Sequence, residues 1–290
     1  MESNFLTAVF LPLALFIIMM GMGLGLKVDD FKRVLVEPKA VILGLIAQLI
    51  LLPIVGFLLA GIFPLTPELA VGVMILVACP GGATSNMITY LVRGNVAVSI
   101  TLTAISSLIT VFTIPLVVNL AMESFMGGEA ALQLPILKTV MQIAVITLIP
   151  VSLGMLLNYY TPQFATKVEK TVKWLSLFFL ALIIFGLLLK ERANVLHSLR
   201  QVGGVTLTLN VVTMLIGYGI GTVAKLDDSI TKAITVEVGI QNGTLAIAIA
   251  STLLNTPSMA IPAGIYSLLM FVTSAVFALW VRNRKVISIQ

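Results

Sequence analysis

Charged residues are scarce in this sequence. Asp, Glu, Lys and Arg make up 10% of its 290 residues, whereas a soluble domain carries about 25%. Hydrophobic residues make up 59%, and the mean hydropathy is +1.12. Since so few charges cannot cover the surface of a soluble protein, the composition predicts a single all-α polytopic membrane domain over residues 1–290.

Cysteine and histidine are almost absent, with one of each at Cys79 and His197. A single cysteine excludes an intrachain disulfide. The spans contain no His or Cys cluster of the kind that binds zinc and no nucleophile–base pair. We therefore expect no enzyme, no catalytic residues and no cofactor. The N-terminus has Glu2 and no basic segment, so its first apolar run does not read as a cleavable signal peptide.

Long hydrophobic runs dominate what is present. A membrane-spanning helix needs about 20 apolar residues, and the sequence offers nine such runs. They are 4–26, 38–63, 69–92, 95–121, 133–158, 171–190, 203–224, 229–253 and 258–282. The fifth and the eighth carry Lys138 and Lys232 near their starts, where a lysine can reach the membrane interface. The glycines of "GMGLGL" at 21–26 indicate close helix packing.

The basic residues lie between these runs and predict the orientation, not nucleic-acid binding. With the N-terminus outside, thirteen of the 17 Lys and Arg residues lie inside: Lys27, Lys32, Arg33, Lys39, Arg93, Lys167, Lys170, Lys173, Lys225, Lys232, Arg282, Arg284 and Lys285. The other four lie outside: Lys138, Lys190, Arg192 and Arg200. We expect a multi-pass protein of the inner (plasma) membrane with a cytoplasmic C-terminus, and a monomer.

Two of the nine runs are interrupted and polar. Residues 79–86 read "CPGGATSN" and residues 237–244 read "EVGIQNGT". In the favoured topology these runs cross the membrane in opposite directions. Spans five to nine (133–282) then form one repeat and the first four (1–121) form the same repeat without its first helix. Paired broken helices in an inverted repeat are typical of secondary transporters; the alternative is two glycine-rich helices that pack closely.

Glu237 is the only acidic residue well inside a span. A carboxylate at this depth needs a proton, a cation or a partner. Gln241 follows one helical turn later, and a break near Gly239 would free the carbonyls of Val238 and Ile240. Further candidate oxygens come from Ser85, Asn86, Gln48 and the stripe Ser99, Thr103, Ser106 and Thr110. We give Ser106 and Thr110 no role, and we expect Gln48 to bond the opposite break.

Three stretches resemble the bile acid:sodium symporter family over nearly the whole chain. They are "GMGLGLKVDDFKRVL", "CPGGATSNMITYLVRGNVAVSITLTAISSL" and "ITVEVGIQNGTLAIAIA". The resemblance implies nine helices in a 4+5 inverted repeat, a panel and a core domain, and two discontinuous helices that cross in the core. It also implies that the only metal is sodium, at two sites.

The resemblance assigns residues to these sites. The first sodium site would use Ser85, Asn86, Ser99, Thr103 and Glu237. The second would use Gln48, Glu237, Gln241 and the carbonyls of Val238 and Ile240. The substrate would contact Ala83, Thr84, Asn242, Met270 and Phe271. Relatives that bind bile acids have Thr where Ala83 stands and a His-Asn pair where Met270-Phe271 stands, so the resemblance does not single out bile acid.

The expected function is sodium-coupled import of a small organic anion by alternating access. The anion would be a bile-acid-like, pantoate-like or other carboxylate, and the partners would be sodium, this anion and the lipid bilayer. A proton-coupled antiporter with Glu237 as the proton carrier is one alternative. A non-transporting receptor or channel is another.

Overall fold

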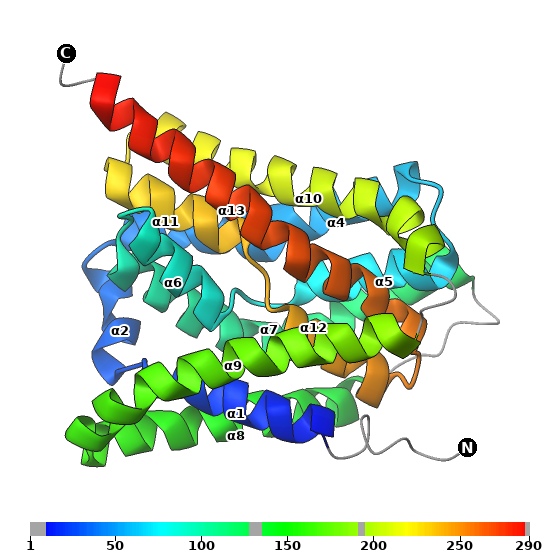
Figure 1. Cartoon of the computed structure of the whole chain (residues 1–290), viewed down its shortest axis with the longest axis horizontal. Helices are drawn as coiled ribbons and strands as arrows, with labels where there is room; N and C mark the ends of the chain where they lie inside the picture. The colour runs from blue at the N-terminus through cyan, green and yellow to red at the C-terminus, as the bar shows by residue number, and fades with distance from the viewer. Residues whose placement is uncertain (1–9, 128–134, 191–194, 288–290) are drawn as a thin grey trace.

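The computed structural model describes residues 10–127, 135–190 and 195–287, and this part of the chain is helical (Figure 1). Short turns join the helices wherever the described part of the chain is continuous. They are α1 (Leu11–Leu24), α2 (Val28–Lys32), η2 (Arg33–Leu35), α3 (Pro38–Ile46), η3 (Ala47–Leu51), α4 (Leu52–Ile62), α5 (Pro67–Ala78), α6 (Ala83–Leu91), α7 (Val96–Met126), α8 (Ile136–Tyr160), α9 (Pro162–Lys190), α10 (Val195–Val223), α11 (Asp228–Gly239), α12 (Gly243–Ala248), η4 (Ile249–Leu253), η5 (Pro257–Ala260) and α13 (Ile261–Ile287).

Among the described residues, five helices are long and apolar enough to cross a membrane. They are Pro38–Ile62, Val96–Met126, Ile136–Tyr160, Arg200–Val223 and Pro257–Asn283. A sixth candidate is the pair Leu11–Leu24 and Val28–Leu35, which is bent by 71°. The predicted class, an all-helical multi-pass membrane protein, is therefore confirmed, whereas the number of nine spans stays a prediction.

Several predicted boundaries differ from the structure. The run predicted at 171–190 begins earlier, because α9 starts at Pro162 and only Thr161 separates it from α8. The run predicted at 4–26 includes residues outside the described part, and its helix starts at Leu11. The two interrupted runs are each split into two helices, as their Gly and Pro content predicts.

The linkers of the two split runs pair with each other. Cys79 and Gly82 are extended at the ends of the first linker, and Ile240 is extended in the second. The Asn242 N–H donates to the Pro80 carbonyl at 3.0 Å, and Gly81 and Gln241 form an isolated antiparallel bridge. Figure 1 shows the two linkers crossing near the centre of the molecule.

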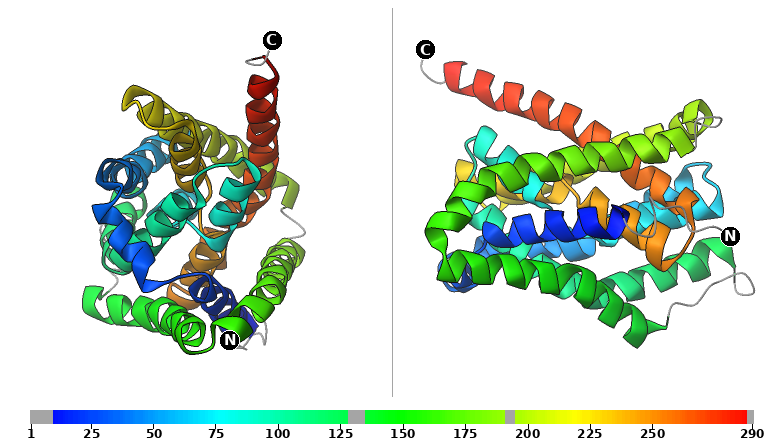
Figure 2. Two further views of the ribbon diagram at one scale, coloured as in Figure 1. Left: turned by 90° about the vertical axis from the view of Figure 1, so that its left-hand side faces the viewer. Right: turned by 60° about the horizontal axis from the view of Figure 1, so that its bottom comes forward.

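The helices α1, α8 and α9 pack together along one side of the molecule (Figure 2). Glycine permits this close approach, since a Cβ atom at Gly23 would overlap the Val151 carbonyl and one at Gly154 would overlap the Met20 carbonyl. The predicted packing role of the "GMGLGL" glycines is confirmed for Gly23. The remaining helices surround the two linkers on the other side.

Candidate functional site

The Glu237 carboxylate lies buried at the last turn of α11 and accepts three hydroxyl hydrogen bonds. Ser85 Oγ donates to its Oε2 at 2.8 Å, and Ser99 Oγ donates to the same atom at 3.0 Å. Thr103 Oγ1 donates to Oε1 at 2.6 Å. Because Ser85 comes from α6 and the other two from α7, three helices meet at one carboxylate.

The Asn86 amide completes this group. Its Oδ1 atom lies 2.8 Å from Ser99 Oγ and 3.4 Å from Thr103 Oγ1. The structure thus brings together all five residues assigned to the first cation site. We call Ser85, Asn86, Ser99, Thr103 and Glu237 the carboxylate cluster. Ser106 and Thr110, which received no role, bond carbonyls of their own helix.

Gly81 admits the carboxylate to this position. A Cβ atom at Gly81 would overlap Glu237 Oε1. The sequence indicated only that Gly81 interrupts a helix. Gly81 also lets the carboxylate at the end of α11 approach the linker backbone. This second role follows from the crossing of the two linkers and has no signal in the local sequence.

Gln48 and Gln241 form a second polar group next to the linkers. Gln48 Nε2 donates to Gln241 Oε1 at 2.8 Å and to the Cys79 carbonyl at 3.3 Å. Gln241 Nε2 donates to the Val238 carbonyl at 2.8 Å. The expectation that Gln48 bonds the opposite break is confirmed. We call Gln48 and Gln241, with the carbonyls of Val238 and Ile240, the amide cluster.

The expected helical relation between Glu237 and Gln241 is wrong. The helix α11 ends at Gly239 and Ile240 is extended, so Gln241 lies in the linker rather than one turn further along the helix. The hydrogen bonds of Glu237 run to the carboxylate cluster, whereas those of Gln241 run to Gln48 and Val238. The two clusters are therefore adjacent along the chain and bonded to different partners.

Gln48 lies in a π-helical turn, Ala47–Leu51, that interrupts the helix between α3 and α4. Pro53 follows this turn and has no N–H to give to the Leu49 carbonyl four residues earlier. The wider turn accommodates this missing hydrogen bond. Single π-helical turns of this kind recur at functional sites.

A cavity beside the linkers holds most of the predicted substrate contacts. Ala83, Thr84, Asn242 and Met270 line it, and Phe271 does not. Gln241 of the amide cluster lines it as well, together with residues to which the sequence assigned no site role: Ile18, Met19, Gly21, Met22, Gly82, Met87, Gly243 and Thr244. Among the described residues, no Lys or Arg belongs to this lining. Asn242 Oδ1 accepts from the Leu245 N–H at 3.0 Å, so this side chain also caps α12.

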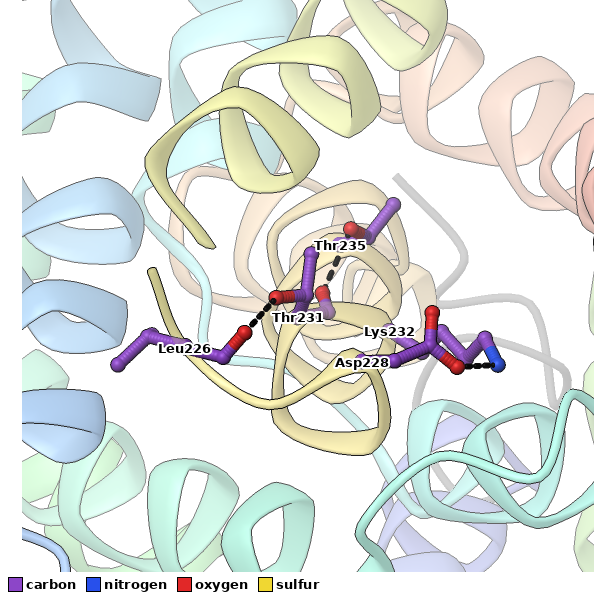
Figure 3. Close-up of polar contacts among 5 residues, drawn as sticks. All are labelled: Leu226, Asp228, Thr231, Lys232 and Thr235. Atoms are coloured by element: carbon purple, nitrogen blue, oxygen red, sulfur yellow. Dashed lines mark hydrogen bonds and ion pairs between the residues drawn. The ribbon is translucent and has the colours of Figure 1, made fainter. Parts of the chain in front are cut away.

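Lys232, which was expected to reach the membrane interface, is held by a local ion pair near the start of α11. Its side chain is 5% exposed and forms an ion pair with Asp228, one turn earlier on α11. Figure 3 shows this pair together with two hydroxyl groups of the same helix. The Thr231 hydroxyl lies 3.4 Å from the Leu226 carbonyl, and the Thr235 hydroxyl donates to the Thr231 carbonyl at 2.7 Å. The ion pairs among the described residues, Lys32–Asp29 and Lys232–Asp228, leave Glu237 without a basic partner.

The start of α11 is also bonded to the turn between α6 and α7. The Asn95 N–H donates to the Ser229 carbonyl at 2.7 Å, and a Cβ atom at Gly94 would press against the Lys232 side chain. This turn joins the two helices that supply the hydroxyl groups of the carboxylate cluster. The three helices that meet at Glu237 are therefore also linked at one end.

Comparisons with known proteins identify the family. A family model described as "Sodium Bile acid symporter family" matches residues 12–198, more than half of the chain. The chain is similar to the uncharacterized sodium-dependent transporter YocS of Bacillus subtilis (strain 168), with 34% identity over 259 residues, 89% of this chain and 78% of that protein. It is similar to the probable sodium/metabolite cotransporter BASS1, chloroplastic, of Arabidopsis thaliana, with 28% identity over 281 residues, 97% of this chain and 69% of that protein.

A more distant match is the P3 protein of Homo sapiens, with 29% identity over 250 residues, 85% of this chain. The chain spans about half of that relative's length (51%). These matches confirm the resemblance carried by the glycine-rich and polar motifs around the two breaks. The chain therefore belongs to the sodium bile acid symporter family, a family of transporters and not of enzymes.

Proposed function

We propose that this chain is a symporter that imports a small organic anion together with sodium ions by alternating access. The observation that carries the proposal is the carboxylate cluster: Glu237 is buried at paired helix breaks, accepts three hydroxyl hydrogen bonds and has no basic partner in the ion pairs of the described residues. A buried carboxylate without a counter-charge is costly, so a cation at this position stabilises it.

We assign a first sodium ion to the carboxylate cluster. Hard cations prefer carboxylate, carbonyl and hydroxyl oxygens. Ser85, Ser99 and Thr103 donate their hydrogens to Glu237, and each hydroxyl oxygen keeps lone pairs for a cation. Asn86 offers its amide oxygen to the same place. A proton carrier would need only the carboxylate, so this set of oxygens favours sodium over proton coupling.

We assign a second sodium ion to the amide cluster, with Glu237 shared between the two sites. Gln48 and Gln241 each carry an amide oxygen, and Val238 and Ile240 contribute carbonyls from the end of α11. A half-turn of either amide exchanges its N–H₂ group for its oxygen with little change of shape. The pair can therefore present oxygens to a cation without moving the helices.

The proposal includes a topology. Residues 1–121 form the shortened first repeat and residues 133–282 form the second repeat, with nine spans in all, the N-terminus outside and the C-terminus in the cytoplasm. Support comes from the pairing of the two broken segments and from the packing of α1, α8 and α9 against one another. We assign those three helices to a panel domain and the others to a core domain in the inner membrane.

The cavity lined by Ala83, Thr84, Asn242 and Met270 is the proposed substrate site. We place Phe271 next to it as a residue that supports Met270. Because the described residues of the lining include no Lys or Arg, the attraction for an anion would come from the N-terminal end of α6, which begins at Ala83. Relatives named as sodium-dependent or sodium/metabolite transporters support the coupling ion and leave the metabolite unnamed.

The test has two stages. A thermal-shift screen of the purified protein against small carboxylates, with and without sodium, identifies anions that stabilise it only when sodium is present. Uptake of such an anion into proteoliposomes is then measured with an inward sodium gradient. We expect uptake to require sodium, and equal uptake with potassium or choline in place of sodium at fixed pH would overturn the proposal.

A further inference from the structure

A third group of buried polar side chains meets at the break in the second repeat, from helices that contribute nothing to the carboxylate cluster. Asn210 on α10 and Tyr266 on α13 are both fully buried. Asn210 Nδ2 donates to the Gly239 carbonyl at 2.6 Å and to the Tyr266 hydroxyl at 3.0 Å. The Tyr266 hydroxyl in turn donates to the Gly239 carbonyl at 2.8 Å. The three groups form a closed triangle around one backbone oxygen.

The triangle supplies more hydrogen-bond donors than the last carbonyl of the helix needs. The Gly239 carbonyl is the last of α11 and has no partner within its helix. One donor would satisfy it, yet two donors from two different helices converge on it. The oxygen of the Asn210 amide is left buried without a hydrogen-bond partner among the described residues. The Asn210 amide therefore donates both N–H groups within the triangle, and its oxygen accepts no hydrogen bond there, although an unpaired buried oxygen is unfavourable.

The orientation of the Gly239 carbonyl determines where the next carbonyl points. Ile240 is extended, with φ −116° and ψ 102°, and successive residues of an extended chain face opposite sides. Since the Gly239 oxygen is held toward α10 and α13, the Ile240 oxygen turns away from those helices. A side chain at position 239 would overlap Met214, so the backbone there is also held by packing.

We propose that Asn210 and Tyr266 are positioning residues for sodium binding: they clamp the Gly239 carbonyl and so aim the Ile240 carbonyl and the Gln241 side chain at the second sodium ion. This inference rests on the proposed function, because it needs a cation at the amide cluster. Neither residue touches the ion itself.

The decisive variant is Tyr266→Phe, which removes one donor to Gly239 and keeps the ring that fills the space between the helices. Loss of one hydrogen bond of ordinary strength corresponds to about fivefold in an equilibrium constant. We expect the sodium concentration for half-maximal thermal stabilisation to rise about fivefold and the titration to become less steep, because only one of two ions is weakened. The midpoint without sodium serves as a separate measure of folding.

Thr206→Val is the matched control. Thr206 is fully buried one turn before Asn210 on α10, and its hydroxyl donates to the Val202 carbonyl of its own helix at 2.7 Å. The Thr206→Val substitution removes one buried hydroxyl away from the break, and the sodium response of this variant should match that of the wild type. If Tyr266→Phe does not fold, Asn210→Ala removes the other donor while Tyr266 keeps its own, with the same expected shift.

Glu237→Gln in the same assay separates the two proposals. If Glu237→Gln loses the sodium response while Tyr266→Phe and Asn210→Ala titrate like Thr206→Val, the clamp is overturned and the sodium sites stand. If Glu237→Gln keeps the wild-type response, the sodium sites are overturned and the clamp falls with them. Both the sodium sites and the clamp are supported if Glu237→Gln loses the sodium response and the two clamp variants, Tyr266→Phe and Asn210→Ala, give a weaker and less steep sodium titration.

Discussion

The charge of Glu237 is the single property on which both proposed ion sites depend. An attraction between unit charges in contact is worth about 4 kcal/mol at an effective dielectric constant of about 20. Even a quarter of this, about 1 kcal/mol per ion, changes the affinity about fivefold. We expect Glu237→Gln to abolish sodium-dependent thermal stabilisation and transport while the protein stays folded in detergent.

Ser106→Ala is the control for Glu237→Gln. Ser106 is buried on α7 with Ser99 and Thr103, but its hydroxyl lies 3.2 Å from the Thr103 carbonyl and makes no bond to the carboxylate. It should leave the sodium response unchanged. A wild-type response in Glu237→Gln would mean that this carboxylate is structural and that both sites are assigned wrongly.

Gly81→Ala tests the same cluster from the linker. The added methyl group would overlap Glu237 Oε1 and push the carboxylate away from its hydroxyl partners. We expect the sodium response to fall at least as far as in Ser85→Ala, which removes one of these partners, as measured by sodium titration of the thermal midpoint. Gly61→Ala, where a Cβ atom has open space, should keep the response; equal effects at the two glycines would show that the overlap is tolerated.

At the scale of residues, the sequence predicted which polar side chains form the clusters better than it predicted how they are arranged. The oxygen-bearing side chains of the carboxylate cluster were identifiable because each is a polar residue in an apolar run. Asn210 and Tyr266 were missed because buried Asn and Tyr residues are common at helix contacts, and nothing in their local sequence shows that both meet Gly239. Three methionines of the cavity, Met19, Met22 and Met87, were missed because pattern alone does not distinguish them from core residues.

At the scale of elements, the start of α11 depends on one ion pair. The Lys232 side chain is 5% exposed and that of its partner Asp228 is 71% exposed. Asp228→Asn would leave the Lys232 ammonium without a charged partner. A hydrogen bond to a charged group contributes about 1.5–3 kcal/mol, and exposure of the carboxylate reduces this. We expect a loss of about 1 kcal/mol in stability and faster amide hydrogen exchange over residues 228–236.

The exposed pair at the start of the chain is the control. Asp29 and Lys32 lie on α2 with side chains that are 80% and 67% exposed. Solvent weakens such a pair to between about 0 and 1 kcal/mol, so Asp29→Asn should leave both measurements near those of the wild type. If Asp228→Asn and Asp29→Asn lowered the stability by the same amount, we would conclude that the burial of Lys232 does not strengthen its ion pair with Asp228.

The breaks in the helices were predictable, and the bends between helices were not. Pro80, Gly81 and Gly82 mark the first break, and Gly239 and Gly243 mark the second, since each residue type disfavours a continuous helix. The 71° bend after α1 and the start of α9 at Pro162 have weaker local signals. The π-helical turn at Gln48 depends on how α3 and α4 accommodate Pro53, which a hydropathy pattern does not contain.

At the scale of the whole molecule, the distribution of basic residues gives the expected topology. Thirteen of 17 Lys and Arg residues lie on the side proposed to be cytoplasmic, and this bias sets orientation. A fluorescent reporter that matures only in the cytoplasm should therefore be active when fused to the C-terminus, and a phosphatase that folds only in the periplasm should be inactive there. The reverse pattern would contradict the proposed topology.

The antiparallel pairing of the two linkers has a consequence for how the chain can be divided. Ser85 and Asn86 precede α8 in the chain and Glu237 and Gln241 follow it, so neither half contains all the ligands that we propose for either ion. The Asn242–Pro80 hydrogen bond joins the halves at their most polar point. If the chain were expressed as two fragments that separate between α7 and α8, each alone would be indifferent to sodium. Co-expressed in one membrane, the fragments would recover the response by complementation, because the ion itself would hold the two halves together.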